Sequence, residues 1–419
     1  MSLVGKPGYQ EIAGCWIPCE WVKSKLSELV DVIYGKSPAE LQKLAAGIPI
    51  FGTGGVTGYT DVALYDGPSV ILGRKGTIDK VQRSNGPFWA IDTTFYTTPK
   101  QNFDWAWLYY VMSSFDLRKL NEASGVPSIG RSSLESLNLA VPPFPEQQKI
   151  AAILTAVDDK LDVIVRQIEG TQTLKKYLMQ TLFSRGVGTQ DVAGRWIPHT
   201  EFKDSLLREI PLRWSVDKLD THVTKVGSGV TPKGGSDAYL SSGIPLIRSQ
   251  NVLVGRLSLT DVAFISDEQH QKMRNSALIP CDVLLNITGA SIGRCAILPA
   301  DFGEGNVNQH VCIIRPSLSL NPRYLCHYLN SSAGQKQIDR FQAGGNREGL
   351  NYQQIRSFDL PVPPPAEQQK IAEILDGVDD KLQTLVAKQA CCKSLKRGLM
   401  QKLLTGEWRV KLDAPTEAA

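Results

Sequence analysis

The sequence predicts an α+β protein: two globular domains joined by two long helices that form an antiparallel coiled coil, in a pseudo-twofold tandem repeat. A 20-residue segment occurs twice, from Pro142 and from Pro363, with 15 of 20 positions identical. The copies lie 221 residues apart, so the repeating unit is a domain plus a helix. Each copy continues as a heptad pattern, whereas the flanking segments contain short β-branched runs between Gly, Pro and Asn.

Domain 1 is expected over residues 1–141, with strands at 48–51, 70–72 and 95–97 and a helix at 104–115. Its N-terminal segment contains GCWIP from Gly14, which resembles GRWIP from Gly194, just after the first long helix. We therefore expect the N-terminal segment to pack near the end of the second long helix.

The first long helix is expected over residues 142–186, after prolines that restrict the backbone ahead of a helix. Its apolar seam alternates four- and three-residue steps, which is the spacing of a coiled coil. The seam consists of Ile150, Leu154, Val157, Leu161, Ile164 and Ile168.

Domain 2 is expected over residues 187–361, and the second long helix with a C-terminal tail over residues 362–419. The two domains differ in most residues, yet their turn residues correspond: Gly35 and Pro38 in domain 1 match Gly229 and Pro232 in domain 2. The seam of the second helix consists of Ile371, Leu375, Val378, Leu382 and Leu385.

The charges of the two helices favour antiparallel pairing. Acidic residues such as Asp158 and Asp379 come early in each helix, and basic residues such as Lys175 and Lys396 come late. Antiparallel pairing therefore sets acid against base, whereas parallel pairing would set like charges side by side. Lys175 and Lys396 also interrupt the apolar seam. A helix of about 38 residues would be roughly 57 Å long.

Composition excludes several classes of protein. No apolar run approaches the roughly 20 residues of a membrane helix, and the first residues lack the apolar core of a signal peptide, so we expect a cytoplasmic protein without membrane contact. The eight cysteines and five histidines have no metal-ligand spacing, so no metal site is predicted. There is no phosphate-binding G-x-x-x-x-G-K-[ST] loop and no nucleophile–base grouping, so we predict no catalytic residues.

The duplicated P-x-x-E-Q-Q-K-I-A-x-I-L-x-x-V-D-D-K-L helix, the variable flanking domains and the run DVLLNITGASIG from Asp282 resemble the specificity subunit of type I restriction-modification enzymes. The resemblance covers essentially the whole chain. It implies that each variable domain is a target recognition domain that reads one half of a bipartite site in double-stranded DNA. In domain 1 the run from Gly73, GRKGTI, replaces the threonine-glycine run of the family pattern.

The resemblance also implies partners and their cofactors. The helices would set the spacer between half-sites and dock two modification subunits, which bring S-adenosylmethionine. Restriction subunits that hydrolyse ATP with Mg²⁺ would join the same assembly. No cofactor is expected on this chain. A spacer of roughly 57 Å limits the two contact points to at most about 17 base pairs.

Loop residues that can hydrogen-bond to bases or phosphates are the candidates for DNA binding. In domain 1 they are Lys36, Thr53, Arg74, Lys75, Arg83 and Arg131. In domain 2 they are Thr231, Lys233, Arg248, Ser249, Gln250, Asn251, Asn346, Arg347 and Asn351. The net charge of +4 permits DNA binding through local patches but does not require it.

Two alternative functions stay open at this point. The chain could be a coiled-coil scaffold that binds no DNA, or the specificity portion of a methyltransferase or nuclease of another restriction type. Methyl transfer by the chain alone would favour the latter, and failure to bind any duplex would favour the scaffold.

Overall fold

The computed structural model describes residues 5, 7–12, 15–232, 234–235, 239–342 and 349–412. The chain divides into two compact units. Unit 1 consists of Met1–Arg166 and Val386–Ala419, and unit 2 of Gln167–Leu385. Each unit therefore combines one globular domain with half of each long helix, α4 (Phe144–Arg185) and α9 (Pro365–Leu403). The long helices begin two or three residues later than the sequence indicated.

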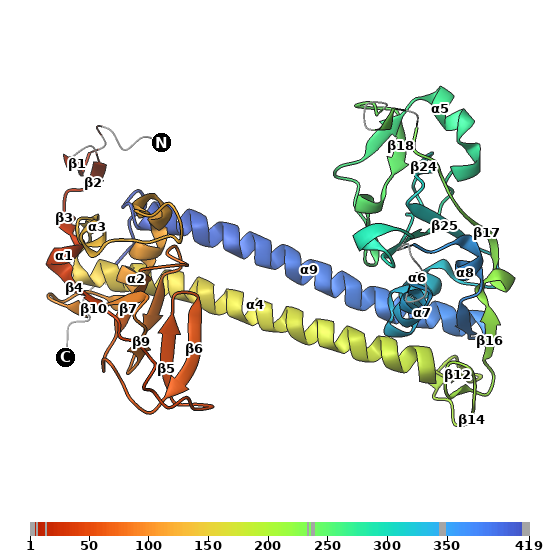
Figure 1. Cartoon of the computed structure of the whole chain (residues 1–419), viewed down its shortest axis with the longest axis horizontal. Helices are drawn as coiled ribbons and strands as arrows, with labels where there is room; N and C mark the ends of the chain where they lie inside the picture. Colours follow the sequence, from red (N-terminus) through yellow and green to blue (C-terminus); the bar gives the residue numbers. More distant parts are fainter. Residues whose placement is uncertain are drawn as a thin grey trace. The chain divides into compact units, whose positions relative to one another are not determined.

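Unit 1 is built on a four-stranded antiparallel sheet in the order β4-β10-β7-β8, with α2 packed on β7 and β8. Figure 1 labels β4, β10, β7 and α2 of this group. A second sheet, in the order β6-β5-β9, pairs β5 with β9 in parallel. The strands are β1 (Tyr9–Ile12), β2 (Cys15–Pro18), β3 (Val22–Lys25), β4 (Val30–Tyr34), β5 (Ile48–Gly52), β6 (Gly55–Thr60), β7 (Ser69–Gly73), β8 (Gln82–Ser84), β9 (Trp89–Ala90), β10 (Thr94–Pro99) and β11 (Asn138–Val141). The helices are α1 (Leu26–Leu29), α2 (Trp105–Ser114), η1 (Leu117–Leu120) and α3 (Arg131–Glu135).

Unit 2 repeats this topology with other residues. Its four-stranded sheet has the order β17-β25-β22-β23, and its three-stranded sheet, β21-β18-β24, again contains one parallel pair. The principal strands are β16 (Ser215–Lys218), β17 (Val223–Ser228), β18 (Ile244–Ile247), β21 (Ala263–Ile265), β22 (Val283–Asn286), β23 (Cys295–Ile297), β24 (Asn306–Val307), β25 (Val311–Pro316) and β26 (Asp359–Val362). Short strand pairs are β12 (Thr189–Gln190) with β13 (Trp196–Ile197), β14 (Phe202–Lys203) with β15 (Ile210–Pro211), and β19 (Val252–Leu253) with β20 (Arg256–Leu257).

The helices of unit 2 include two that the sequence did not predict, α5 (Asp267–Lys272) and α7 (Ser332–Gln342). The other helices are η2 (Leu219–His222), η4 (Ser249–Asn251), η5 (Arg274–Ser276), η6 (Gly289–Ser291), α6 (Pro322–Asn330) and α8 (Tyr352–Arg356). Helix α7 packs beside α6 (Figure 1), and its only fully buried apolar side chain is that of Ile338. Ala333 and Phe341 pack against the same core as Ile338, so α7 has one apolar face, but only these three of its eleven residues are apolar, which left the segment unrecognised in the sequence.

The strands predicted from β-branched runs are confirmed within one or two residues, because these runs form the buried centres of the sheets. All five residues of β7 and all four of β22 are buried.

The glycines that correspond between the two domains, Gly35 and Gly229, are required by close contacts with a neighbouring backbone. A Cβ atom on Gly35 would lie 2.1 Å from the carbonyl oxygen of Ile91, and one on Gly229 would lie 1.7 Å from that of Val307. Only glycine permits this close approach of two backbones.

The long helices run antiparallel within each unit, as their charges predicted. In unit 1, Asp158 of α4 pairs with Lys396 of α9 at 2.7 Å, and Glu146 pairs with Arg409, which follows α9. In unit 2, Lys175 of α4 pairs with Asp379 of α9 at 2.5 Å. Residue numbers thus rise on one helix as they fall on the other. The lysines that interrupt the heptad seam therefore pair with acids at equivalent repeat positions.

The seam residues have two roles. Ile150 and Leu154 belong to the hydrophobic core of unit 1, and Ile371 and Leu375 to that of unit 2. Ile164 and Leu385 are also buried, and the other members of the seam are half-buried: Val157, Leu161, Ile168, Val378 and Leu382. The first three turns of each helix are therefore part of a domain core rather than only a coiled-coil surface.

A buried glutamate fixes the start of each long helix. Glu367, with 2% of its surface exposed, accepts hydrogen bonds from Trp214 Nε1 at 2.8 Å and from the backbone N–H groups of Val187 and Gly188, which follow α4. Glu146 accepts bonds from Trp21 Nε1 at 2.9 Å and from Arg409. In unit 1 the N-terminal segment joins this junction, because Tyr9 donates to the carbonyl of Gly406 at 2.7 Å.

The first glutamine of each E-Q-Q motif connects its long helix to a helix of the preceding globular domain. Gln147 accepts a hydrogen bond from the N–H of Asp104, the N-cap of α2, at 2.9 Å. Gln368 accepts one from the N–H of Asn321, the N-cap of α6, at 2.8 Å. Helices α2 and α6 therefore start at equivalent points of the repeat, which makes Tyr110 equivalent to His327 and Val111 equivalent to Tyr328.

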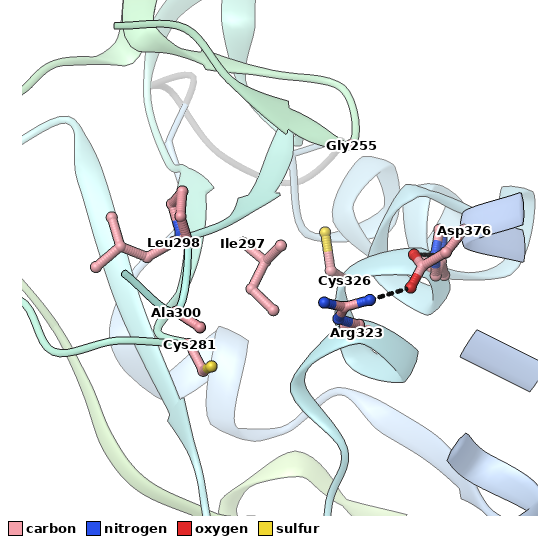
Figure 2. A pocket seen from close by; sticks show the side chains of 10 residues that line it. Gly255, Cys281, Ile297, Leu298, Ala300, Arg323, Cys326 and Asp376 are labelled. Atoms are coloured by element: carbon pink, nitrogen blue, oxygen red, sulfur yellow. Dashed lines mark hydrogen bonds and ion pairs between the residues drawn. The ribbon is translucent and has the colours of Figure 1, made fainter. Parts of the chain in front are cut away.

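An ionic cluster in unit 2 surrounds His327. Its Nε2 lies 2.7 Å from Asp376, which also pairs with Arg323 at 2.8 Å, and its Nδ1 lies 4.0 Å from Asp379, the partner of Lys175. Figure 2 shows Arg323 and Asp376 beside a cavity of about 120 Å³, which Cys281 and Cys326 also line. Burial favours a higher pKa for Asp376, but the hydrogen bonds from His327 and Arg323 outweigh burial and hold this pKa below its ordinary value.

We predict that Glu367→Ala destabilises the protein by about 3 kcal/mol, because it leaves a buried indole N–H and two backbone N–H groups without acceptors. The measurement is urea unfolding followed by circular dichroism. Glu373→Ala, on the exposed side of the same helix, is the matched control and should change stability by less than about 0.5 kcal/mol. Equal unfolding midpoints for the two variants would contradict the assigned role of Glu367.

We predict that the stability of unit 2 falls with acid more steeply in the wild type than in Asp376→Asn. A carboxylate whose pKa is lowered in the folded state stabilises that state above its unfolded pKa, about 3.9, and this contribution is lost as the pH falls through the folded value. Urea midpoints measured from pH 6 to pH 2 test this. Asp380→Asn, at an exposed site on α9, should keep the wild-type slope, and a parallel decline for all three proteins would refute the prediction.

Candidate functional site

The loops at corresponding strand ends carry different side chains in the two units. In unit 2, the N–H of Ile287 donates to the carbonyl of His310 at 3.0 Å, and Thr288 forms a bridge with Gly349. In unit 1, the N–H of Arg74 donates to the carbonyl of Thr93 at 2.9 Å, and Lys75 bridges Ser128. The GRKGTI run therefore occupies the same structural position as NITGAS, although no residue besides one glycine matches.

The strand ends of unit 2 carry a set of neutral hydrogen-bonding side chains, which we call the polar face: Ser228, Thr231, Thr288, Gln309, His310 and Tyr352. His310 Nδ1 lies 2.6 Å from Thr288 Oγ1, and its Nε2 lies 3.0 Å from Gln309 Nε2. Thr231 donates to Gln309 Oε1, and Ser228 bonds to the hydroxyl of Tyr352. These contacts bring four chain segments together.

The equivalent loops of unit 1 carry three cations and a threonine, and we call this set the basic face: Lys36, Thr53, Arg74 and Lys75. The guanidinium of Arg74 lies 5.0 Å from the centre of the Tyr34 ring, and its Nη1 donates to the carbonyl of Asp92 at 3.0 Å. Lys36 and Lys75 are exposed, and Thr53 lies beside Gly76. Lys80, which the sequence did not single out, donates to the carbonyl of Gly54 on the same loop.

Several candidates are used by the fold itself. Arg83 lies over the Tyr109 ring, and Arg131 pairs with Glu135 at 2.6 Å. Asn251 is 2% exposed and bonds to the backbones of Arg248, Ser258 and Asp261, so its amide is not available to DNA. Asn351 caps helix α8.

Two further candidates of unit 2, Arg248 and Gln250, approach the carboxylate of Asp261. Gln250 donates to Asp261, and Arg248 approaches Asp261 at 3.7 Å while lying 5.3 Å from the centre of the Tyr239 ring. The carbonyl of Ser249 accepts a hydrogen bond from Asn286 at 2.9 Å. Lys233, Asn346 and Arg347 lie outside the described residues.

Sequence reasoning missed five members of the polar face: Ser228, Thr288, Gln309, His310 and Tyr352. The only signal was the polar tripeptide Asn308–His310 between β24 and β25. Its partners lie about 20 to 80 residues away in the chain, so the grouping appears only in the folded structure.

Unit 1 contains an open groove of about 980 Å³ between α2, β11 and α9. Its floor includes Val111, Leu139 and Leu404, and Lys393 and Arg397 stand at its rim. The same place is filled in unit 2. There Tyr328 packs against Phe183 with ring centres 5.4 Å apart, and Gln337 of α7 bonds to both Tyr328 and Asp359. A smaller residue at 111 and the lack of a helix like α7 therefore leave the groove open.

Both long helices expose a leucine at the same repeat position. Leu174 of α4, in unit 2, is 50% exposed, and Leu395 of α9, in unit 1, is 52% exposed. An isolated exposed leucine is unremarkable, but here both units expose the same apolar side chain beside their Lys–Asp pair.

Two further classes of site are absent from the described ranges. Within residues 5–412, apart from 6, 13–14, 233, 236–238 and 343–348, no three His, Cys, Asp or Glu side chains are grouped so that they could hold a metal ion. In the same part of the chain, no helix combines the length and apolarity needed to cross a membrane.

A family model for the type I restriction modification DNA specificity domain matches residues 18–170 and 221–390, one match for each repeat. Among curated relatives, the type I restriction enzyme MjaVIII specificity subunit of Methanocaldococcus jannaschii is 24% identical over 98% of both chains. The MjaIX specificity subunit of the same organism is 24% identical over 94% of this chain and 95% of its own.

Among solved structures, the fold is similar to that of the S subunit of a type I restriction-modification system from M. genitalium. The TM-score is 0.63 at 17% identity, covering 92% of this chain and 96% of that one. This likeness concerns the fold, because so low an identity does not carry residue roles across.

Proposed function

Because the chain belongs to the type I restriction modification DNA specificity family, we propose that it is the specificity subunit of such a system. Each globular domain reads one half of a bipartite, asymmetric site in double-stranded DNA. The observation that carries this proposal is the repeat itself: the same sheet order supports a basic face in unit 1 and a neutral polar face in unit 2. Two different readers on one scaffold suit a site whose halves differ.

The two faces are suited to different parts of the DNA. Lys36 and Lys75 are exposed cations, which can bind phosphate oxygens. They can also donate hydrogen bonds to the two major-groove acceptors of guanine. The polar face of unit 2 offers neutral donors and acceptors, which suit base edges. We therefore propose that binding to the first half-site is the more salt-dependent of the two.

The chain itself is proposed to supply recognition and no chemistry. Modification subunits would bring S-adenosylmethionine, and restriction subunits would bring ATP and Mg²⁺ to the same assembly. The relatives named as specificity subunits support the coarser statement that such chains work within a restriction enzyme.

We further propose that α4 and α9 set the spacer between half-sites. They comprise 42 and 39 residues, which correspond to about 63 and 58 Å of helix. Lengthening or shortening both helices would then alter the separation of the half-sites without altering their base sequences.

The exposed leucines suggest where modification subunits dock. Leu174 and Leu395 are equivalent in the repeat and similarly exposed, so they offer two copies of one contact to two copies of one partner. In unit 1, the open groove with Lys393 and Arg397 at its rim offers additional surface.

The expected activity is dependent on a partner. The purified chain should transfer no methyl group alone, but should direct adenine methylation to one bipartite sequence when mixed with a modification subunit and S-adenosylmethionine. Sequencing of methylated adenines on genomic DNA measures this, with the modification subunit alone as control. Methylation by the chain alone would instead identify a methyltransferase, and failure of the assembled complex to bind any duplex would favour a scaffold.

For docking, we predict that Leu174→Asp and Leu395→Asp each reduce the number of bound modification subunits from two to one, and that the double variant binds none. A buried charge without a partner would disrupt each apolar contact. Native mass spectrometry counts the subunits. Leu318→Asp, at a fully exposed loop position, is the control and should still bind two. Two subunits on the double variant would rule out this docking surface.

A further inference from the structure

We propose that Gln309 reads an adenine in the half-site of unit 2, through the major groove, with Thr231 and His310 as its positioning residues. The inference rests on the proposed function of the chain, because it assigns one base of the site that unit 2 recognises. It concerns a base that is read and not the adenine that receives the methyl group.

The backbone that carries Gln309 is fixed at several points. Asn308, 5% exposed, accepts the N–H of His310 on its side chain at 3.1 Å and the N–H of Gly229 on its carbonyl at 3.1 Å. Its own N–H donates to the carbonyl of Ile247 at 3.1 Å. The turn is therefore attached to the ends of β17 and β18, while the carbonyl of His310 is held by Ile287 of the loop after β22. The side chain of Gln309 is exposed beyond this anchored turn.

The amide of Gln309 is held by two neighbours. Thr231 bonds to its oxygen, and the Nε2 atom of His310 lies 3.0 Å from its nitrogen. Thr288 in turn fixes the imidazole through Nδ1 at 2.6 Å. A glutamine amide has two N–H donors and two acceptor lone pairs. One donor and one lone pair are used by these neighbours, so one donor remains on the amide nitrogen and one lone pair on the amide oxygen.

The donor and the lone pair that Gln309 keeps do not depend on which end of its amide carries the oxygen. If the amide is reversed, Thr231 accepts from the nitrogen and His310 donates to the oxygen, since both residues can take either role. In both orientations the neighbours use one donor and one lone pair. The exposed amide of Gln309 therefore keeps one donor and one acceptor on neighbouring atoms in either orientation.

A donor beside an acceptor matches one base. Adenine presents an N7 acceptor and an N6 amino donor in the major groove, and glutamine binds this pair in bidentate fashion. Guanine presents two acceptors there, cytosine only its amino donor, and thymine an acceptor beside a methyl group. A fixed amide therefore favours adenine over the other bases by between about fivefold and a hundredfold.

The six members of the polar face are all neutral polar side chains, which bind phosphate oxygens as well as base edges. The donor and acceptor of the Gln309 amide together favour a base over a phosphate, because a phosphate oxygen only accepts. The basic face at the corresponding loops of unit 1 has Lys75 where unit 2 has Thr288. The neutral network of unit 2 orients a side chain rather than supplying charge.

The test uses the full chain assembled with its modification subunit. First, sequencing of methylated adenines defines both half-sites for the wild type. Binding is then measured against a duplex set that carries each of the four bases at every position of the second half-site. The variants are Gln309→Leu, Gln309→Glu and Thr231→Val, with Thr231→Ser as the conservative rescue. Gln271→Leu, an exposed glutamine on α5, is the matched control.

We expect Gln309→Leu to lose a five- to hundredfold preference for adenine at one position, with the first half-site and the other positions unchanged. Gln309→Glu should shift that position toward cytosine, whose amino group can donate to a carboxylate. Thr231→Val should weaken the adenine preference and Thr231→Ser should restore it, while Gln271→Leu should match the wild type.

Two outcomes would overturn the proposal. One is an unchanged base preference at every position in Gln309→Leu. The other is a uniform loss of affinity for all four bases in both Gln309 variants, which would assign Gln309 to the backbone or to folding. A wild-type complex that methylates no bipartite site would instead refute the proposed function, and this result appears before any variant is compared.

Discussion

The buried glutamate at the first turn of each long helix is the contact on which the rest of the molecule depends. Glu146 and Glu367 each bind a tryptophan from the start of their own domain, and each binds the chain that follows the other long helix. A carboxylate with so little exposure is tolerated because several donors and the positive end of a helix surround it. One glutamate thus connects its globular domain, its own long helix and the segment that follows the other long helix.

The contacts at this junction explain which parts of the two repeats are the same and which differ. The E-Q-Q motif must recur because its glutamine accepts a hydrogen bond from the N-cap residue of α2 or α6. Its glutamate accepts a hydrogen bond from the domain's buried tryptophan. The sheets recur because the buried strands pack in the same order. The loops at the strand ends take no part in either requirement, so they are free to carry lysines in one unit and neutral polar residues in the other.

The candidate site was only partly predictable. Thr231, Arg74 and Lys75 were identified as loop residues, and the structure places them on the polar and basic faces. Asn251 fitted the same description, yet it is buried and binds three backbone groups. Loop sequences do not reveal whether a polar side chain faces solvent or the backbone of its own loop. Gln309 and His310 escaped notice because their partners are distant in sequence.

The sequence alone determined the tandem repeat, the two long helices, their antiparallel sense and the central strands of both sheets, because these depend on local periodicity and on charges spread along a helix. Only the tertiary structure decided that the first seam residues complete a domain core, that Tyr328 and α7 fill in unit 2 the groove left open in unit 1, and which polar residues share a face. Those features depend on contacts between segments tens to hundreds of residues apart, which no local pattern encodes.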